Sequence, residues 1–369
     1  MKLRLLEYLR CPECLGSFDL TATQVTQVDR MQYPHAVHPC SGRCPYPSVT
    51  NHVRDCDTCV TYEVLEGRLR CTGCDREFTV RDGVPRLLGT GSHATDAPTA
   101  QTSSTFGYLW RQSVIPGPPA AQPYHFAKMA QALGLQHSTG VVLDGGCGDG
   151  IDLVNHALGG DVEVIGVELS DGGCETSFAR IATLPLAHVV QGDLRRLPFE
   201  PATFDTVSSY GVLHHVASPP AAAAELARVL RPNGHVTIYV YEDFSERAFF
   251  WRWALALVNK IRAVTTRLPP RALYRLSQCA SPIVYVLLTL PHRALMLMPW
   301  TRSLAESFPY RHGKGPFTMA GDLYDRFSAP LEARYSRRSA GELLADTGLE
   351  VTKVAYERGW MVLARSSPK

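Results

Sequence analysis

The chain has 369 residues, 45% of them hydrophobic and 20% charged, and a formal net charge of +2. This length accommodates one large domain and a smaller one, and the composition is ordinary for a globular enzyme. The small net charge gives no overall basic field, so composition does not favour nucleic acid as a partner, although it does not exclude an RNA substrate. The first residues alternate charge and leucine without an apolar core, so we expect no secretory signal and a cytoplasmic protein whose cysteines bind metal.

Cysteines gather near the start of the chain, where eight of the eleven precede residue 75. We therefore predict a separate N-terminal zinc-ribbon module at residues 1–89. Two C-x2-C pairs, Cys11 with Cys14 and Cys71 with Cys74, each offer two thiolates from a tight turn, and together they complete the tetrahedron of a structural zinc site. The insertion between the pairs indicates a second zinc, with free buried thiols as the alternative; its cysteines are Cys40, Cys44, Cys56 and Cys59.

The segments around the outer pairs, LLEYLRCPEC and CTGCDREFTVRDGVPRLL, resemble the two halves of the small zinc-binding activator protein that partners tRNA, rRNA and release-factor methyltransferases. Neither zinc site has an open coordination position, so we expect both to be structural rather than catalytic. After this module, residues 90–104 are small and polar and are predicted to be a linker.

From residue 141 the chain alternates short β-branched apolar runs with helical segments, and a helical run near 124–134 precedes them. This alternation predicts an α/β domain with a parallel sheet covered on both faces. The pattern resumes near residue 338 with a helix that ends at Gly348, then a strand, and then a last strand in GWMVLAR. The predicted domain therefore comprises residues 105–245 and 336–369. The predicted strands are 141–144, 162–168, 187–193, 205–211 and 235–241, and the predicted helices lie near 150–158, 172–183 and 219–230.

Residues 246–335 interrupt this domain, and the first part, 246–300, is apolar, rich in arginine and helical in pattern. Its two apolar stretches are broken by charged residues or prolines, so we expect no transmembrane segment. Three interpretations stay open: a helical cap that shapes an apolar substrate pocket, a face that lies on a membrane, or a packed helical pair that could also form a homo-oligomer interface.

The first strand of the α/β domain ends at Asp144 and is followed by Gly145, Gly146, Gly148 and Gly150. These glycines do not match the G-x-G-x-x-G dinucleotide fingerprint, and Asp149 would repel a phosphate, so the loop suits a ligand without phosphate. Acids also close the next two strands. The carboxyl ends of successive parallel strands lie along one edge, where ligands bind in open α/β sheets; the acids there are Asp144, Glu168 and Asp193.

The segments VLDGGCGDG, GVELS, QGDLRRLPF, FDTVSSYGVLHHV and LARVLRPNGHVTIYV resemble, in order, the motifs of class I S-adenosylmethionine-dependent methyltransferases. One departure is Asn233-Gly234-His235, which replaces a Gly-Gly pair. The resemblance implies a Rossmann-like, doubly wound seven-stranded sheet whose last strand is antiparallel. It implies that Asp144, Gly145, Gly146 and Gly148 hold the methionine end and ribose, Glu168 and Leu169 the ribose, and Asp193 and Leu194 the adenine. The predicted cofactor-binding set also includes Phe106, Trp110 and Tyr210.

Candidates for the chemistry lie after the fourth and fifth strands. His214 or His215 could act as a general base, or could only border the cofactor, and Tyr241 is a further candidate. In FGYLW, Phe106 and Trp110 form an aromatic lid over the cofactor or only pack the entry helix. The segment Ser209-Tyr210-Gly211-Val212 lacks the Asn/Asp-Pro-Pro-aromatic tetrapeptide of enzymes that methylate exocyclic amines.

These observations predict an S-adenosylmethionine-dependent methyltransferase with structural zinc that acts on a small, partly apolar acceptor. The activator-like ribbon raises a second hypothesis, methylation of RNA or a translation factor. A third is non-enzymatic: the ribbon activates a separate partner and the large domain only binds the cofactor.

Overall fold

The structure is a computed structural model, and it describes residues 1–28, 61–89, 96–112, 125–135, 140–159, 162–247, 249–306 and 314–367. By contacts between Cα atoms these residues form two compact units, Met1–Arg247 with Leu331–Lys369 and Ala248–Pro330. The predicted inner zinc ligands Cys40, Cys44, Cys56 and Cys59 lie outside the described residues.

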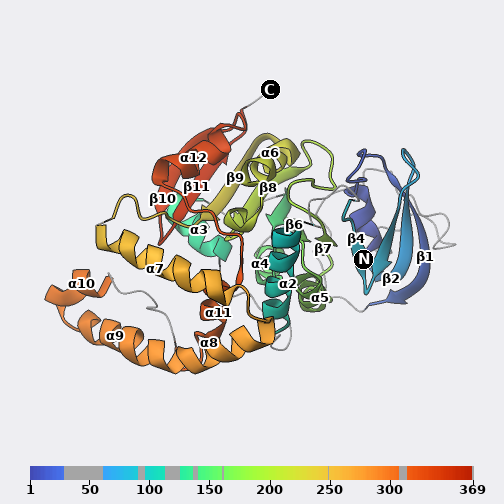
Figure 1. Cartoon of the computed structure of the whole chain (residues 1–369). Helices are drawn as coiled ribbons and strands as arrows, with labels where there is room; N and C mark the ends of the chain where they lie inside the picture. The colour runs from blue at the N-terminus through green and yellow to red at the C-terminus, as the bar shows by residue number, and fades with distance from the viewer. Residues whose placement is uncertain are drawn as a thin grey trace. The chain divides into compact units, whose positions relative to one another are not determined.

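The first unit is built on one mixed sheet (Figure 1). Its described strands follow the order β1-β2-β3-β4-β7-β6-β5-β8-β9-β11-β10. The seven from β7 to β10 are the predicted Rossmann-like sheet, with β11 antiparallel to both β9 and β10, which confirms the predicted fold class. The bounds of these seven are β5 Gly140–Gly145, β6 Val162–Glu168, β7 Ala187–Gln191, β8 Phe204–Tyr210, β9 Leu230–Val240, β10 Glu350–Tyr356 and β11 Trp360–Arg365.

Helices cover both faces of the sheet because successive strand residues point to opposite sides. In β5, Val141 and Leu143 join an apolar cluster with α6 and α12, whereas Val142 joins a second cluster with α4 and α5. Strands buried on both faces account for the near-continuous Val and Ile runs in the sequence. The helices of this unit are α2 Ala97–Arg111, α3 His125–Leu133, α4 Ile151–Leu158, α5 Asp171–Arg180, α6 Pro219–Val229 and α12 Arg337–Ala345, with short 3-10 turns η1 Leu3–Glu7 and η3 Leu213–His215.

The strands of the N-terminal ribbon continue the large sheet. Its last strand β4 lies parallel to β7, with Arg86 opposite Gln191, and the Leu87 amide donates to the Gln191 carbonyl at 2.9 Å. Leucines of η1 share one buried cluster with the strands of the large sheet. The ribbon strands are β1 Phe18–Gln27, β2 Tyr62–Cys71, β3 Glu77–Arg81 and β4 Val84–Arg86.

A buried ionic network fixes the ribbon on β6 and β7. Arg4 donates from Nε to both carboxylate oxygens of Glu163 at 3.0 and 3.1 Å and from Nη2 at 2.8 Å, and the Tyr8 hydroxyl donates to the same carboxylate at 2.6 Å. His188 Nε2 lies 3.0 Å from Glu163 Oε1, and the Lys2 ammonium donates to the Ala187 carbonyl at 2.6 Å. The ribbon therefore covers the edge strand that the seven-stranded sheet would otherwise expose.

The predicted linker at residues 90–104 is wrong in its second half, where α2 begins at Ala97. The Asp96 side chain accepts a hydrogen bond from the Thr99 amide at 2.8 Å, and Pro98 stands in the first turn. A short polar cap followed by proline starts a helix, so the small polar composition of this segment misled the prediction.

The second unit, Ala248–Pro330, is helical in its described residues and differs by a few residues from the predicted bounds 246–335. Within it, α11 packs against both α7 and α8. Helix α8, a π-helical turn and α9 run on as one curved helix (Figure 1). That helix, Pro270–Met296, is long and apolar enough to cross a membrane, and only 11% of its most apolar window is buried inside the protein. The bounds are α7 Phe249–Thr265, α8 Pro270–Val284, η4 Tyr285–Thr289, α9 Leu290–Met296, η5 Pro299–Thr301, α10 Arg302–Glu306 and α11 Ala320–Ser328.

Candidate functional site

The loop after β5 has a backbone that requires glycine. Gly146 and Gly148 have φ values of +84° and +55°, in the left-handed region that side chains disfavour. A Cβ atom on Gly146 would lie 2.4 Å from Val212, and one on Gly148 would lie 2.9 Å from the indole of Trp110. Gly145 is confined as well, because its Cβ would stand 3.3 Å from the Leu194 side chain. The loop therefore brings its backbone close to its neighbours without intervening side chains.

Three buried carboxyl groups surround this loop. Asp144 ends β5, Glu168 ends β6, and Asp152 stands in the first turn of α4; each is less than a tenth exposed. Burial, followed by the charges of Asp152 and Glu168, raises the pKa of Asp144 well above its usual value. Burial also raises the pKa of Glu168, against the opposing effect of its hydrogen bonds. This concentration of acid in low dielectric favours a cationic ligand.

Glu168 has a fixed orientation. Its Oε2 accepts a hydrogen bond from the Gly148 amide at 3.1 Å, and its Oε1 accepts from the amide and hydroxyl of Ser170 at 2.8 and 2.6 Å. The following residue, Leu169, is held by its carbonyl, which accepts from the Gln191 side chain at 3.0 Å. The carboxylate thus links the end of β6 to the glycine loop after β5.

Asp193, after β7, is paired with a cation. Arg195 donates from Nε to Oδ1 at 3.0 Å and from Nη2 to Oδ2 at 2.8 Å, and its backbone amide also donates to Oδ1 at 2.9 Å. The same guanidinium lies 3.6 Å from Asp96, the residue that caps α2. Arg195 therefore connects the predicted adenine acid to the start of α2.

Asp149 has a different surrounding from the one its place in the sequence suggests. Its carboxylate forms an ion pair with Arg180 of α5 at 2.9 Å, and Arg180 Nε donates to the Asp149 carbonyl at 2.8 Å. The charge that would repel a phosphate is therefore largely neutralised. The glycine spacing and the three buried acids, and not Asp149, therefore disfavour a ligand that carries phosphate.

Aromatic side chains approach the loop from α2 and α3. Phe106 and Trp110 stack with ring centroids 6.3 Å apart, and Phe106 lies 5.1 Å from the ring of His215. Tyr210, at the end of β8, stacks on His125 at 4.1 Å, and His125 Nδ1 lies 3.2 Å from Asp152. Phe106 and Trp110 thus lie between α2 and the motifs after β5 and β8, a position that suits the predicted lid.

The predicted catalytic candidates form a compact aromatic group. His214 is fully buried, with its ring 3.9 Å from that of Tyr241 and 4.3 Å from that of His215. His215 Nδ1 donates to the Leu331 carbonyl at 2.6 Å, which leaves Nε2 as the only ring nitrogen of this residue that could accept a proton in that tautomer. Arg334 lies over the Tyr241 ring at 5.5 Å.

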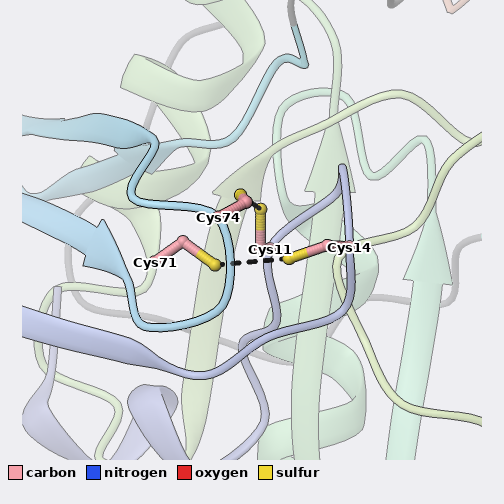
Figure 2. A group of neighbouring side chains, drawn as sticks. All are labelled: Cys11, Cys14, Cys71 and Cys74. Atoms are coloured by element: carbon pink, nitrogen blue, oxygen red, sulfur yellow. Dashed lines mark hydrogen bonds between the residues drawn. The ribbon is translucent and has the colours of Figure 1, made fainter.

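The two outer cysteine pairs face one another in the ribbon (Figure 2). All four Sγ atoms lie within 4.8 Å of one another, with Cys11 and Cys74 3.7 Å apart and Cys14 and Cys71 3.4 Å apart. A tetrahedral zinc ion with Zn–S bonds of about 2.3 Å requires sulfur atoms roughly 3.8 Å apart, so the four thiols fit zinc. The Gly73 amide donates to Cys71 Sγ at 3.3 Å, and the Glu13 amide to Cys11 Sγ at 3.4 Å, an arrangement that stabilises thiolates.

Sequence reasoning missed four side chains that build the site. Asp152 and His125 have no recognisable spacing from the glycine motif. Arg180 reaches Asp149 through a tertiary contact, and Arg195 pairs with Asp193, two residues before it, as well as with the distant Asp96. A signal did exist for Ser170, since Ser-Asp-Gly-Gly after a strand is typical of a helix N-cap. Its hydroxyl indeed accepts from the Gly173 amide at 3.1 Å.

Two protein families match parts of the chain. Residues 143–238 match the family described as "Methyltransferase domain", and residues 2–83 match the family described as "Trm112p-like protein". An uncharacterized 37.1 kDa protein of a Streptomyces fradiae transposon is 40% identical over 26% of this chain and 28% of its own length. A demethylmenaquinone methyltransferase of Symbiobacterium thermophilum is 33% identical over 32% of this chain and 51% of its own. The chain thus spans between about a quarter and a half of these relatives.

Solved structures with a similar fold include a complex between the Haloferax volcanii Trm112 methyltransferase activator and a putative methyltransferase. That match has 15% identity, covers 71% of this chain and 97% of that one, and has a TM-score of 0.41. Another is a SAM-dependent methyltransferase from Aquifex aeolicus, with 16% identity, coverage of 61% and 81%, and a TM-score of 0.34.

Proposed function

The chain contains a methyltransferase domain of the S-adenosylmethionine-dependent kind and a Trm112p-like zinc-ribbon domain, and from this premise we propose that it transfers a methyl group to a small, partly apolar acceptor. The observation that carries the proposal is the group of buried acids, Asp144, Asp152 and Glu168, around a loop in which Gly146 and Gly148 have no room for a side chain. A ligand with a sulfonium, an ammonium and no phosphate matches that charge and that space.

The residues present fit S-adenosylmethionine, which when bound supplies an electrophilic methyl group. Glu168 would accept hydrogen bonds from the two ribose hydroxyls, since a carboxylate at the end of the second strand of such a sheet has this role. Asp144 and the amides of the glycine loop would hold the methionine end. Asp193 would accept from the adenine amino group only if Arg195 shares or releases an oxygen that it now occupies.

Methyl transfer is an in-line displacement, so most of the rate comes from positioning and from exclusion of water. Phe106 and Trp110 would cover the cofactor, and Tyr241 with His214 would bound the acceptor on an apolar, buried side. When the acceptor must lose a proton, His215 Nε2 would take it, because its Nδ1 is engaged with the Leu331 carbonyl.

A small-molecule acceptor is supported by two observations. The relatives that the chain matches over about half their length include demethylmenaquinone methyltransferases, whose name gives a small-molecule acceptor. The net charge of the first unit is also unsuited to RNA, because the chain outside residues 248–330 carries 26 Lys and Arg against 32 Asp and Glu.

The Trm112p-like domain favours a second candidate, methylation of RNA or of a translation factor, since the ribbon resembles the small zinc-binding activator of tRNA, rRNA and release-factor methyltransferases. In this chain the ribbon is covalently joined to the methyltransferase domain and continues its sheet. We therefore propose that the ribbon mainly stabilises the methyltransferase domain.

The test is transfer of label from methyl-labelled S-adenosylmethionine, with small-molecule extract, total RNA and total protein offered separately. We expect label in the small-molecule fraction, and loss of it in Asp144→Asn but not in the matched control Asp346→Asn, which changes an exposed carboxyl on the last turn of α12. Label only in RNA or in protein would refute the acceptor class. Cellular function retained by an Asp144→Asn chain that no longer binds the cofactor would refute the enzymatic proposal altogether.

A further inference from the structure

The charge of the helical unit differs from that of the rest of the chain. Residues 248–330 hold 11 Lys and Arg against three Asp and Glu, whereas the whole chain is nearly balanced. Within this unit, residues 248–305 carry eight Lys and Arg and not one Asp or Glu. A run of this length without a single acid is a basic, anion-attracting segment.

The same unit carries most of the exposed large apolar side chains of the described residues. Among the described residues 21 large hydrophobic side chains are exposed, and 18 of them lie between Phe249 and Phe317. They include the most exposed ones: Leu297 is 83% exposed, Trp300 78% and Trp253 74%. Scattered exposed leucines are ordinary, but a concentration on one helical unit marks an interaction surface.

In both long helices the polarity is inverted relative to a water-soluble helix. The buried positions of α7 are Arg262 and Thr265, whose side chains donate to the carbonyls of Ala329 and Phe327, each at 2.8 Å. Apolar residues of α7 face outward instead; they are Phe249, Phe250, Trp253, Leu257, Ile261 and Val264.

The helix that runs from α8 to α9 has a similar arrangement, with one apolar side chain, Leu273, among its buried positions. Ser281 is buried and donates to the Pro316 carbonyl at 2.7 Å, and Thr289 is buried with its hydroxyl 3.5 Å from Met319 Sδ. Its exposed side carries the large apolar residues Leu276, Ile283, Val286, Leu287 and Leu290. Helices in water bury their apolar stripe and expose their polar side, so both helices are suited to an apolar medium outside.

We propose that the unit Ala248–Pro330 docks on the surface of a lipid bilayer that contains anionic headgroups. The exposed aromatic and aliphatic side chains would enter the boundary between headgroups and acyl chains, and Lys260, Arg267, Arg271 and Arg275, all exposed near the turn between α7 and α8, would contact the anionic headgroups. The inference depends on the charge and exposure of this unit and not on the methyltransferase activity.

Surface docking fits the unit better than a transmembrane crossing by Pro270–Met296. Arg271, Arg275 and Arg293 interrupt that helix, and a crossing would carry at least one of them into the hydrocarbon core or leave too short an apolar span. Its inner side is already occupied, because α8 packs against α11. A helix with one packed side and one apolar side lies in the interface plane.

The test is cosedimentation of the full zinc-loaded chain with vesicles of phosphatidylcholine alone and of phosphatidylcholine mixed with phosphatidylglycerol. We expect binding to the mixed vesicles, much weaker binding to phosphatidylcholine, and release by high salt and by alkaline carbonate. Arg271→Gln with Arg275→Gln should weaken partitioning roughly 30-fold, since each basic residue near an anionic surface contributes about one kcal/mol. Trp253→Gln with Leu287→Gln should weaken it about tenfold or more.

Matched controls are Arg338→Gln on α12 and Val25→Gln on β1, which change an exposed arginine and an exposed apolar side chain outside the unit and should leave binding unchanged. Circular dichroism of each variant establishes that it is folded. Equal binding to both vesicle types would overturn the electrostatic part, and resistance to alkaline carbonate would show a spanning helix. A wild-type dimer that Trp253→Gln with Leu287→Gln dissociates would show that a second copy covers this face. Either of these last two results overturns the proposal.

Discussion

Removal of Arg4 should destabilise the protein by about 3 kcal/mol near neutral pH, because it leaves the Glu163 carboxylate buried without its cation. Glu163 is fully buried, and Arg4 and His188 hold its pKa at about 2, against the opposing effect of burial. In an Arg4→Met chain the buried group would instead protonate, which at about pH 7 costs roughly 3 kcal/mol for a carboxyl with an ordinary pKa of 4.5. The hydrogen bond from Tyr8 partly offsets this cost.

The assay is urea unfolding of zinc-loaded wild type and Arg4→Met, followed by circular dichroism at about pH 7 and about pH 5. The deficit of the variant should shrink as pH falls, because a protonated Glu163 no longer needs the guanidinium. In the wild type, stability changes with pH in the opposite direction. The lowered pKa of Glu163 contributes stability above about pH 4.5, and this stability is lost as pH falls toward 2.

Two controls accompany this measurement. Arg338→Met removes an exposed i,i+4 ion pair with Glu342 and should leave the stability nearly unchanged. The double variant Arg4→Met with Glu163→Gln should recover most of the loss, since it leaves no uncompensated charge. A loss below about 1 kcal/mol in Arg4→Met, or a loss that is the same at both pH values, would refute the reasoning that this ion pair holds the ribbon on the sheet.

Three further predictions concern the cofactor site, two buried histidines and the zinc. Glu168→Gln should weaken S-adenosylmethionine binding by about tenfold to a hundredfold in isothermal titration, and unchanged affinity would contradict the assigned contact. Burial lowers the pKa of His156 and of His188 to about 4, so between pH 6.5 and 4 only the unfolded chain binds these protons, and the stability of the protein should fall over that range. His156→Phe should make this decrease in stability with pH less steep. An unchanged slope of stability against pH would contradict a buried, neutral His156 ring. Removal of zinc by a chelator, or Cys14→Ser, should unfold the ribbon and expose the β7 edge to hydrogen exchange, and protection that persists without metal would show that zinc is not structural.

Local sequence patterns were sufficient for the central sheet and for the glycine loop. The β-branched runs at 141–144 and 162–168 became β5 and β6, because strands buried on both faces need apolar residues at nearly every position. Gly146 and Gly148 lie in the left-handed region that favours glycine, and a Cβ atom on them would lie 2.4 Å from Val212 and 2.9 Å from Trp110. The C-x2-C pairs likewise determine the zinc ribbon from spacing alone, and their sulfur atoms do converge.

Patterns of this kind do not report which partner a charged residue finds across the fold. Asp149 stands in the expected ligand region, yet Arg180 of α5 pairs with it from 31 residues away, and Arg195 joins Asp193 to the distant Asp96. The segment around Asp96 has a loop-like composition, and the cap that turns it into α2 is a single side-chain hydrogen bond. Long-range electrostatic pairing and capping depend on three-dimensional proximity, which one-dimensional spacing does not contain.

The sequence by itself determined the zinc ligands Cys11, Cys14, Cys71 and Cys74, the strands of the methyltransferase domain and the glycine loop, because each is marked by a local motif or a local period. Only the tertiary structure decided that the ribbon and the methyltransferase domain share one sheet and one core, through the pairing of Arg86 with Gln191 and the burial of Glu163 under Arg4. It also decided that the helical unit turns its apolar side outward, because the direction a helix faces is set by the helix it packs against.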